Sequence, residues 1–89
     1  MSEDAIIAHR IAALLTQHLG ISSEMVTPTA ELAEDLGVDS VDAVEFTLAL
    51  EREFNVVLPD DVIVDARTVQ DVVDLVCERT RATSEARRG

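Results

Sequence analysis

The chain has few of the residue types that build catalytic centres and covalent cross-links. Its 89 residues include one cysteine, two histidines and two aromatic side chains, and all seven basic residues are arginine. The single cysteine, Cys77, cannot form a disulfide within the chain, a pattern common in cytosolic proteins, and we interpret it as a small buried hydrophobe. A chain of this length buries one modest core, so an enzyme with its own substrate pocket is not expected.

Long apolar runs are also missing. No segment reaches the roughly 18 apolar residues that are needed to span a bilayer. The first ten residues, MSEDAIIAHR, begin with acids and lack the basic start and continuous apolar middle of a signal peptide. These absences predict a soluble, cytoplasmic protein with no membrane insertion.

Positive charge is scarce, and the deficit lies in the middle of the chain. The formal net charge is −11. Residues 24–65 contain twelve acids and one basic residue, Arg52, so this segment accounts for the whole excess of negative charge. Phosphate groups are repelled by such a surface, so no nucleic-acid partner is expected. Basic partner proteins are favoured, through an attraction that weakens with salt. A merely solvated acidic surface is the plain alternative.

Aliphatic residues supply the core. Hydrophobic residues make up 47% of the chain, which excludes global disorder and is typical of a small helical bundle. Apolar side chains recur at three- and four-residue steps, which predicts a helix over residues 4–19 that ends at Gly20. The members of this stripe are Ile7, Ile11, Leu14, Leu15 and Leu19.

A long connection over residues 21–38 leads to a second helix, predicted over Ser40–Phe54. Loops of this length are often functional. Asp39 is the expected N-cap, and Asp42, three residues on, completes an arrangement similar to a capping box. The apolar residues expected to pin the connection to the bundle are Val26, Leu32 and Leu36. The apolar face that supports the helix consists of Val41, Val44, Phe46, Leu48, Leu50 and Phe54.

The rest of the chain predicts one short and one longer helix. The short helix is expected over residues 60–65, and Thr68 is the expected N-cap of a last helix that runs to about Arg79. Residues 82–89 have no apolar periodicity, so we expect a disordered tail after a single domain at residues 1–81. The predicted fold class is all-α: a small four-helix bundle of three longer helices and one short helix, with a long first loop.

Neither the histidines nor the acids have the spacing of a metal site. His9 and His18 are nine residues apart, which is wrong for two ligands on one helical face, so we expect them at solvent or at the edge of the core. Asp39, Asp42 and Glu45 have three-residue spacing on a helix and form no EF-hand loop. No metal is therefore predicted.

Ser40 begins the second helix within the segment EDLGVDSVD, between acids and three residues after a glycine. A serine joins a catalytic triad only when a base is near, and both histidines lie in a different segment. An ordinary N-cap serine is the plain alternative. The arrangement favours a hydroxyl that another enzyme modifies, so Ser40 is a candidate attachment point and no catalytic residue is predicted.

These features together resemble the acyl carrier protein family. Its members have an Asp-Ser-Leu triplet after a short glycine-containing loop, which Gly37, Asp39, Ser40 and Val41 match here. Further matches are Asp42, Val44, Glu45, Leu48, Ala49, Leu50, Glu51, Phe54, Leu58-Pro59-Asp60 and Thr68-Val69. A lone triplet is a weak signal, but the loop, the acidic helix and the chain length agree with it.

The resemblance implies that Ser40 receives 4′-phosphopantetheine from coenzyme A through a phosphopantetheinyl transferase. The thiol of this arm would hold acyl groups as thioesters for fatty-acid, polyketide or related specialised biosynthesis. The chain would then be a carrier and not an enzyme. Its other partners would be a ketosynthase, an acyltransferase or an acyl-activating enzyme, and we expect a monomer.

The resemblance also implies two sets of further site residues. The residues that would meet partner enzymes are Asp39, Val41, Asp42, Glu45, Leu48 and Glu51. The residues that would line a cavity for the acyl chain are Phe46, Leu48, Leu58, Ile63 and Val72. Plain core packing is the alternative for the second set.

Two residues depart from the family pattern. Val41 replaces the usual leucine after the serine, and Arg52 interrupts the acidic face, which favours a specialised carrier over the housekeeping fatty-acid carrier. An aminoacyl or peptidyl carrier usually has Gly-Gly-x-Ser, where this chain has Gly37 and Asp39, so that carrier type is the second choice. An unmodified acidic interaction module is the alternative from another class.

Overall fold

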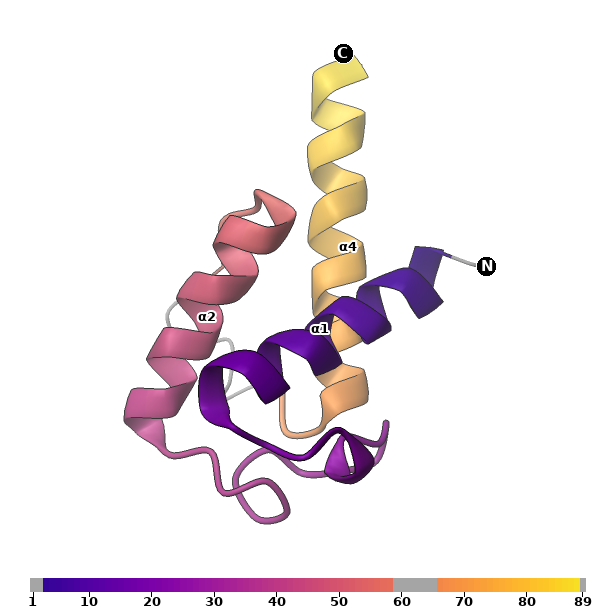
Figure 1. The fold of residues 1–89 in the computed structure, drawn as a ribbon. Helices are drawn as coiled ribbons and strands as arrows, with labels where there is room; N and C mark the ends of the chain where they lie inside the picture. The colour runs from indigo at the N-terminus through magenta and orange to yellow at the C-terminus, as the bar shows by residue number, and fades with distance from the viewer. Residues whose placement is uncertain (1–2, 59–65, 89) are drawn as a thin grey trace.

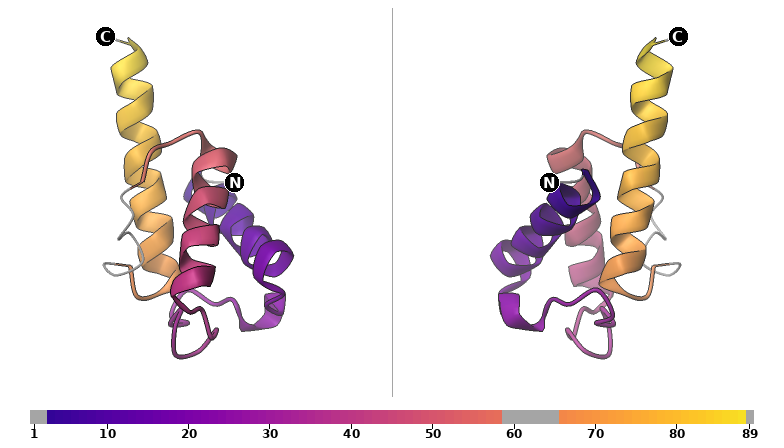
Figure 2. Two further views of the ribbon diagram at one scale, coloured as in Figure 1. Left: turned by 90° about the vertical axis from the view of Figure 1, so that its left-hand side faces the viewer. Right: turned by 90° about the vertical axis from the view of Figure 1, so that its right-hand side faces the viewer.

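The computed structural model describes the backbone of residues 3–58 and 66–88, and side chains up to residue 81. Its elements are α1 (Glu3–Leu19), a 3-10 turn η1 (Ser23–Met25), α2 (Ser40–Phe54) and α4 (Val69–Arg88). Helix α1 packs against both α2 and α4, as the views in Figure 1 and Figure 2 show. The all-α prediction is confirmed, and the predicted bounds of the first two helices agree closely with the structure.

The core lies where the three α-helices meet the long loop. Each helix contributes aliphatic or aromatic side chains that are removed from water, which is the main stabilising term of so small a domain. The largest fully buried side chains are Phe46, Ile11, Leu15, Leu32, Leu50, Val72 and Val76. Cys77 is also buried, which agrees with its interpretation as a small hydrophobe.

The long loop is tied to the start of α4 by backbone hydrogen bonds. The Leu32 N–H donates to the Arg67 carbonyl at 2.9 Å, and the Val69 N–H donates to the Ala30 carbonyl at 3.1 Å. Leu32 is buried as predicted, while Val26 and Leu36 pack half-buried against the core. The loop therefore holds one fixed path from α1 to the first residue of α2.

Thr68 caps α4 as predicted. Its Oγ1 accepts a hydrogen bond from the Asp71 N–H at 3.2 Å, and its own N–H donates to Asp71 Oδ2 at 3.1 Å. This reciprocal pair satisfies two backbone groups that the first turn of a helix leaves without partners. The cap fixes where α4 begins, beside the loop that leads to α2.

The end of α4 differs from the prediction. The helix continues past Arg79 to Arg88, through residues 82–88 that were expected to belong to a disordered tail. Apolar periodicity reports burial, whereas alanine, glutamate and arginine favour helix without burial, and no glycine or proline interrupts the segment before Gly89. Figure 1 shows this part of α4 projecting beyond the bundle.

Two predictions fall on residues that the structure does not describe. The short helix over residues 60–65 and the cavity residue Ile63 both lie outside the described ranges. Within those ranges, no helix combines the length and the apolar content that crossing a membrane requires.

Candidate functional site

Ser40 is the first residue of α2, and its side chain is exposed. Asp39 is the N-cap: its Oδ1 accepts a hydrogen bond from the Asp42 N–H at 2.8 Å. The return bond, from the Asp39 N–H to Asp42 Oδ2, measures 3.5 Å. The predicted capping box is therefore confirmed, with one acid at the N-cap and one in the first turn, where the helix dipole favours negative charge.

The hydroxyl of Ser40 is not used to cap the helix. Asp39 fills that role, and Ser40 makes no side-chain hydrogen bond with the described residues. The plain alternative for this serine, an N-cap, is thus excluded by the geometry. An exposed hydroxyl with no structural task at a helix start is accessible to another enzyme.

The chain reaches Ser40 through a sharp and anchored turn. Gly37 has a φ of +70°, a left-handed conformation that side chains with a Cβ rarely adopt. The next residue, Val38, is buried, and its N–H donates to the Leu32 carbonyl at 2.8 Å. Gly37 thus turns the chain, and the buried and hydrogen-bonded Val38 anchors it two residues before the exposed Ser40.

The structure gives Ser40 no catalytic partner among the described residues. His9 and His18 lie on α1 with exposed side chains, as predicted, and neither is hydrogen-bonded to the serine. Within residues 3–58 and 66–81, no three histidine, cysteine or acidic side chains are grouped to hold a metal ion.

An exposed apolar stripe follows Ser40 along α2. Val41 is 66% exposed, Val44 58% and Leu48 51%. The predicted single apolar face is wrong in this respect, because α2 has two stripes: Phe46 and Leu50 face the core, and Val41, Val44 and Leu48 face solvent. The signal was present in the sequence, since residues at positions 41, 44 and 48 lie on one side of a helix and 46 and 50 on the other.

The acids along α2 differ in what they contact. Glu45 is exposed beside the apolar stripe, whereas Asp39 and Asp42 form the capping box. Glu51 is half-buried, and its Oε2 accepts a hydrogen bond from the Leu58 N–H at 3.0 Å. Of the predicted partner-binding residues, three form contacts within the chain (Asp39, Asp42 and Glu51) and three are exposed (Val41, Glu45 and Leu48). Val44, which the prediction did not include, is also exposed.

The predicted acyl-chain cavity does not come together as one set. Phe46, Leu58 and Val72 are buried in the packed core, but Leu48 lies half-exposed at the surface. Leu48 instead lines open grooves on either side of the exposed stripe. Phe46, Leu58 and Val72 are thus packed as ordinary core residues, which was the alternative to a role in an acyl-chain cavity.

Comparisons with known proteins agree with this geometry. A family model described as "Phosphopantetheine attachment site" matches residues 9–76. The chain is 41% identical over 76 residues to an acyl carrier protein of Thermosynechococcus vestitus, an alignment that covers 85% of this chain and 94% of the relative. The crystal structure of an acyl carrier protein from Thermotoga maritima superposes with a TM-score of 0.78 at 25% identity, covering 91% of this chain and 94% of that one.

Proposed function

The chain belongs to the phosphopantetheine-attachment family of acyl carrier proteins, and we propose that Ser40 is the residue that carries its 4′-phosphopantetheine. Members of this family are carriers and not catalysts, and they work with a phosphopantetheinyl transferase and with biosynthetic enzymes. The observation that carries the proposal is the state of Ser40: an exposed hydroxyl, at the first position of α2, that the capping box leaves unused.

The attachment step needs little from this chain beyond presentation of the hydroxyl. The Ser40 oxygen attacks the phosphorus of the pantetheine-bearing phosphate of coenzyme A, and the transferase takes the serine proton. The bond from that phosphorus to the nucleotide part breaks, so the nucleotide leaves. The new phosphodiester then lies at the N-terminal end of α2, where backbone N–H groups favour an anion.

The terminal thiol of the bound arm supplies the thioester chemistry. An arm tethered at Ser40 holds its acyl group at a high effective concentration for each enzyme that docks. The cargo belongs to fatty-acid, polyketide or related specialised biosynthesis, with Val41 and Arg52 favouring a specialised pathway. Cytoplasmic location, a monomeric state, and a ketosynthase, acyltransferase or acyl-activating enzyme as partner remain part of the proposal.

The docking surface is proposed to be the exposed side of α2. Its apolar contacts are Val41, Val44 and Leu48, and Glu45 supplies negative charge beside them. Apolar side chains that a partner covers give affinity, while the surrounding charge mainly sets the rate of encounter. Asp39 and Asp42 add to the negative field at Ser40, and Glu51 adds charge at the far end of the helix.

Modification in vitro tests the assignment of Ser40. The purified chain is incubated with coenzyme A, magnesium and a broad-specificity phosphopantetheinyl transferase, and its intact mass is measured. The wild type and the control Ser23→Ala, which changes an exposed serine of η1, should each gain one arm. Ser40→Ala should gain none.

The same experiment separates the alternatives. No gain on the wild type would favour an unmodified acidic module, and an equal gain on Ser40→Ala would move the attachment to another residue. Loading of the modified chain with acyl and with aminoacyl groups, by enzymes specific for each, then separates an acyl carrier from an aminoacyl or peptidyl carrier.

A further inference from the structure

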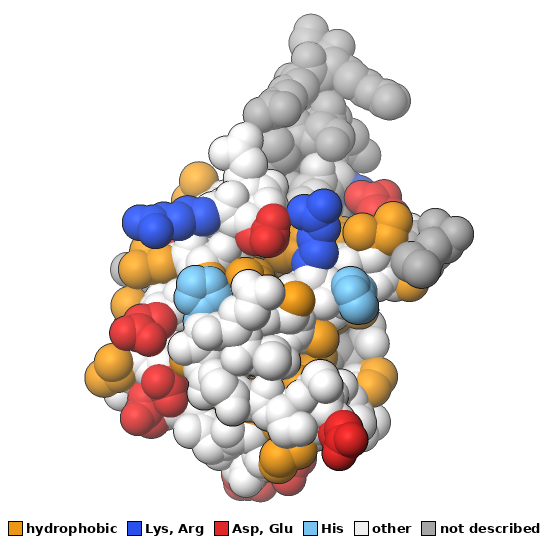
Figure 3. Space-filling view, in the orientation of Figure 1, with side chains coloured by type: hydrophobic (Ala, Val, Ile, Leu, Met, Phe, Trp, Pro, Cys, Tyr) orange, Lys and Arg blue, Asp and Glu red, His pale blue; other side chains and the backbone are white. Residues whose placement is uncertain are grey.

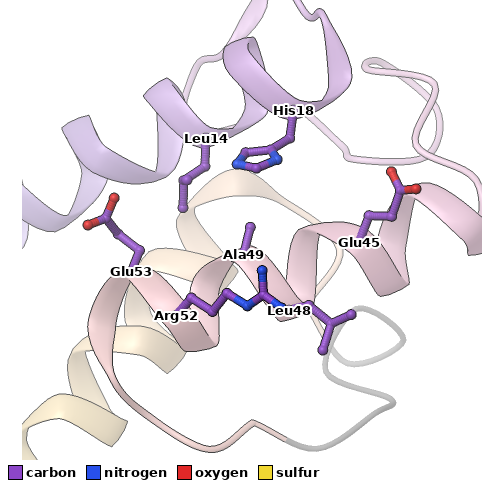
Figure 4. Close-up of a pocket in the computed structure, with 7 residues that line it drawn as sticks. All are labelled: Leu14, His18, Glu45, Leu48, Ala49, Arg52 and Glu53. Carbon is purple, nitrogen blue, oxygen red and sulfur yellow. The ribbon is translucent and has the colours of Figure 1, made fainter.

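A groove of about 610 Å³ runs between α1 and α2. Leu14 and His18 line it from α1, opposite Leu48 and Arg52 of α2 (Figure 4). The remaining lining residues are Glu45, Ala49 and Glu53. The lining combines the buried apolar residues Leu14 and Ala49 with exposed charged or polar side chains.

Charged groups of both signs surround this groove. Arg52 lines it together with Glu45 and Glu53, and the face shown in Figure 3 carries arginine, histidine and acidic side chains. One acid of the groove, Glu53, is already paired, because its Oε2 lies 3.1 Å from Nη1 of Arg10. Glu53 is thus engaged with α1 and is not the partner of Arg52.

Arg52 differs from the other described arginines. Arg10, Arg67 and Arg81 each form an ion pair with a carboxylate, at 3.1, 3.2 and 3.7 Å. Arg79 also has an interaction partner. Arg52 has no hydrogen bond or ion pair with the described residues, although acids precede and follow it in the sequence.

Leu48 gives the unpaired guanidinium an apolar neighbour. It lies one helical turn before Arg52 and is 51% exposed, so the two side chains occupy the same edge of the groove. A cation in the last turn of α2 is favoured by the helix dipole, which accounts for the charge of Arg52. The dipole does not account for an exposed leucine beside it.

We propose that this groove docks a segment of a partner enzyme that presents a carboxylate beside an apolar side chain. The carboxylate pairs with Arg52, whose planar guanidinium binds carboxylates through two parallel hydrogen bonds, and the apolar side chain covers Leu48. The inference rests on the proposed function, because the partners are the enzymes that act on the arm. A partner would then place basic residues against the acids near Ser40 and one acidic residue against Arg52, in the last turn of α2.

The test uses the full chain labelled with 15N and three synthetic helix-forming peptides. Each peptide has one leucine, followed four residues later by glutamate, glutamine or lysine. Titration should shift the backbone amide signals of Leu48, Arg52 and His18 with the glutamate peptide. Because exposed ion pairs are weak, the glutamine peptide should bind only about threefold to fivefold more weakly, and the lysine peptide more weakly still.

Variants of the chain isolate the role of Arg52. Arg52→Gln should bind the glutamate and glutamine peptides with equal affinity, and Arg52→Lys should keep part of the preference for the glutamate peptide. The matched control Arg81→Gln removes one arginine from α4 and should keep the full preference for the glutamate peptide. Circular dichroism checks that each variant is folded.

Several results would overturn the proposal. These are the absence of shifts at the groove, equal affinity of the wild type for glutamate and glutamine peptides, or an unchanged preference in Arg52→Gln. Concentration-dependent shifts of the same amides without peptide would assign the groove to a second copy of the chain. The titration is read on the unmodified chain, so its failure is distinguishable from a failure of Ser40 to accept the arm.

Discussion

The carboxylate of Glu51 accepts a hydrogen bond from the backbone N–H of Leu58 at 3.0 Å. The two residues belong to different parts of the fold, since Glu51 lies in the last turn of α2 and Leu58 is a buried residue after the helix has ended. The backbone carbonyl of Glu51 accepts from Val56 at 3.2 Å. One residue thus ties the chain that leaves α2 back onto the helix.

This contact makes Glu51 a stabilising residue. We expect Glu51→Ala to lower the free energy of unfolding by about 1–3 kcal/mol, because it leaves a backbone donor next to the core without its partner. Glu51→Gln keeps an acceptor and should cost less. Urea denaturation followed by circular dichroism measures both.

The matched control is Glu45→Ala, which removes an exposed acid from the same helix. Its effect should stay within about 0.5 kcal/mol, as for most surface substitutions away from special contacts. If Glu45→Ala and Glu51→Ala lower the free energy of unfolding equally, the hydrogen bond from Leu58 to Glu51 does not stabilise the fold measurably.

Glu45 instead should act on the rate at which partners dock. Glu45→Arg reverses a charge on the exposed side of α2, so the initial kcat/KM of a phosphopantetheinyl transferase for this chain should fall roughly threefold to tenfold at low salt. The dependence of that rate on salt should become flatter, because the screened attraction is smaller.

Glu78→Arg is the control for this charge reversal. It makes the same change in net charge on an exposed position of α4 and should leave the loading rate nearly unchanged. Equal losses from the two variants would mean that only the overall charge matters, and no loss from Glu45→Arg would remove α2 as the docking helix for that enzyme.

Local signals explain which parts of the fold the sequence predicts. The bounds of α2 follow from Asp39, whose cap and first turn lie within four residues, and the start of α4 follows from Thr68 in the same way. The hydrogen bond of Glu51 could not be predicted from the sequence, because its donor is the backbone N–H of Leu58, seven residues away. The fold of the segment after α2 brings that N–H to the carboxylate. The end of α4 was missed because a helix that extends past the core has no apolar periodicity.

The candidate site shows the same division. The sequence indicates Ser40 through its neighbours, and the structure adds that Asp39, and not Ser40, caps α2. The sequence places Val41, Val44 and Leu48 on one side of α2, and the structure shows that this side faces solvent. Apolar spacing on a helix identifies a shared face, but tertiary packing decides whether that face meets the core or a partner.

Cys77 gives the chain one titratable group that responds to alkaline pH. Burial raises the pKa of the Cys77 thiol to about 11, and the hydrogen bond from its Sγ to Asp4 Oδ1, at 3.2 Å, acts in the same direction. In the unfolded chain the thiol has its ordinary pKa, near 9.0. The unfolded state therefore loses its proton first as pH rises, so the stability that the protonated thiol contributes is complete below pH 9.0 and is lost towards about 11.

The composition of the chain makes this loss measurable. Tyrosine and lysine ordinarily ionise in the same pH range, but the chain contains neither. The urea midpoint of the unmodified protein should stay level between pH 8 and about 9 and then decline up to about 11, and Cys77→Ala should remove the decline. Asp4→Asn should reduce it, because without the carboxylate the thiol ionises more easily in the folded state. A decline of the same size in Cys77→Ala would show that another process destabilises the fold at alkaline pH.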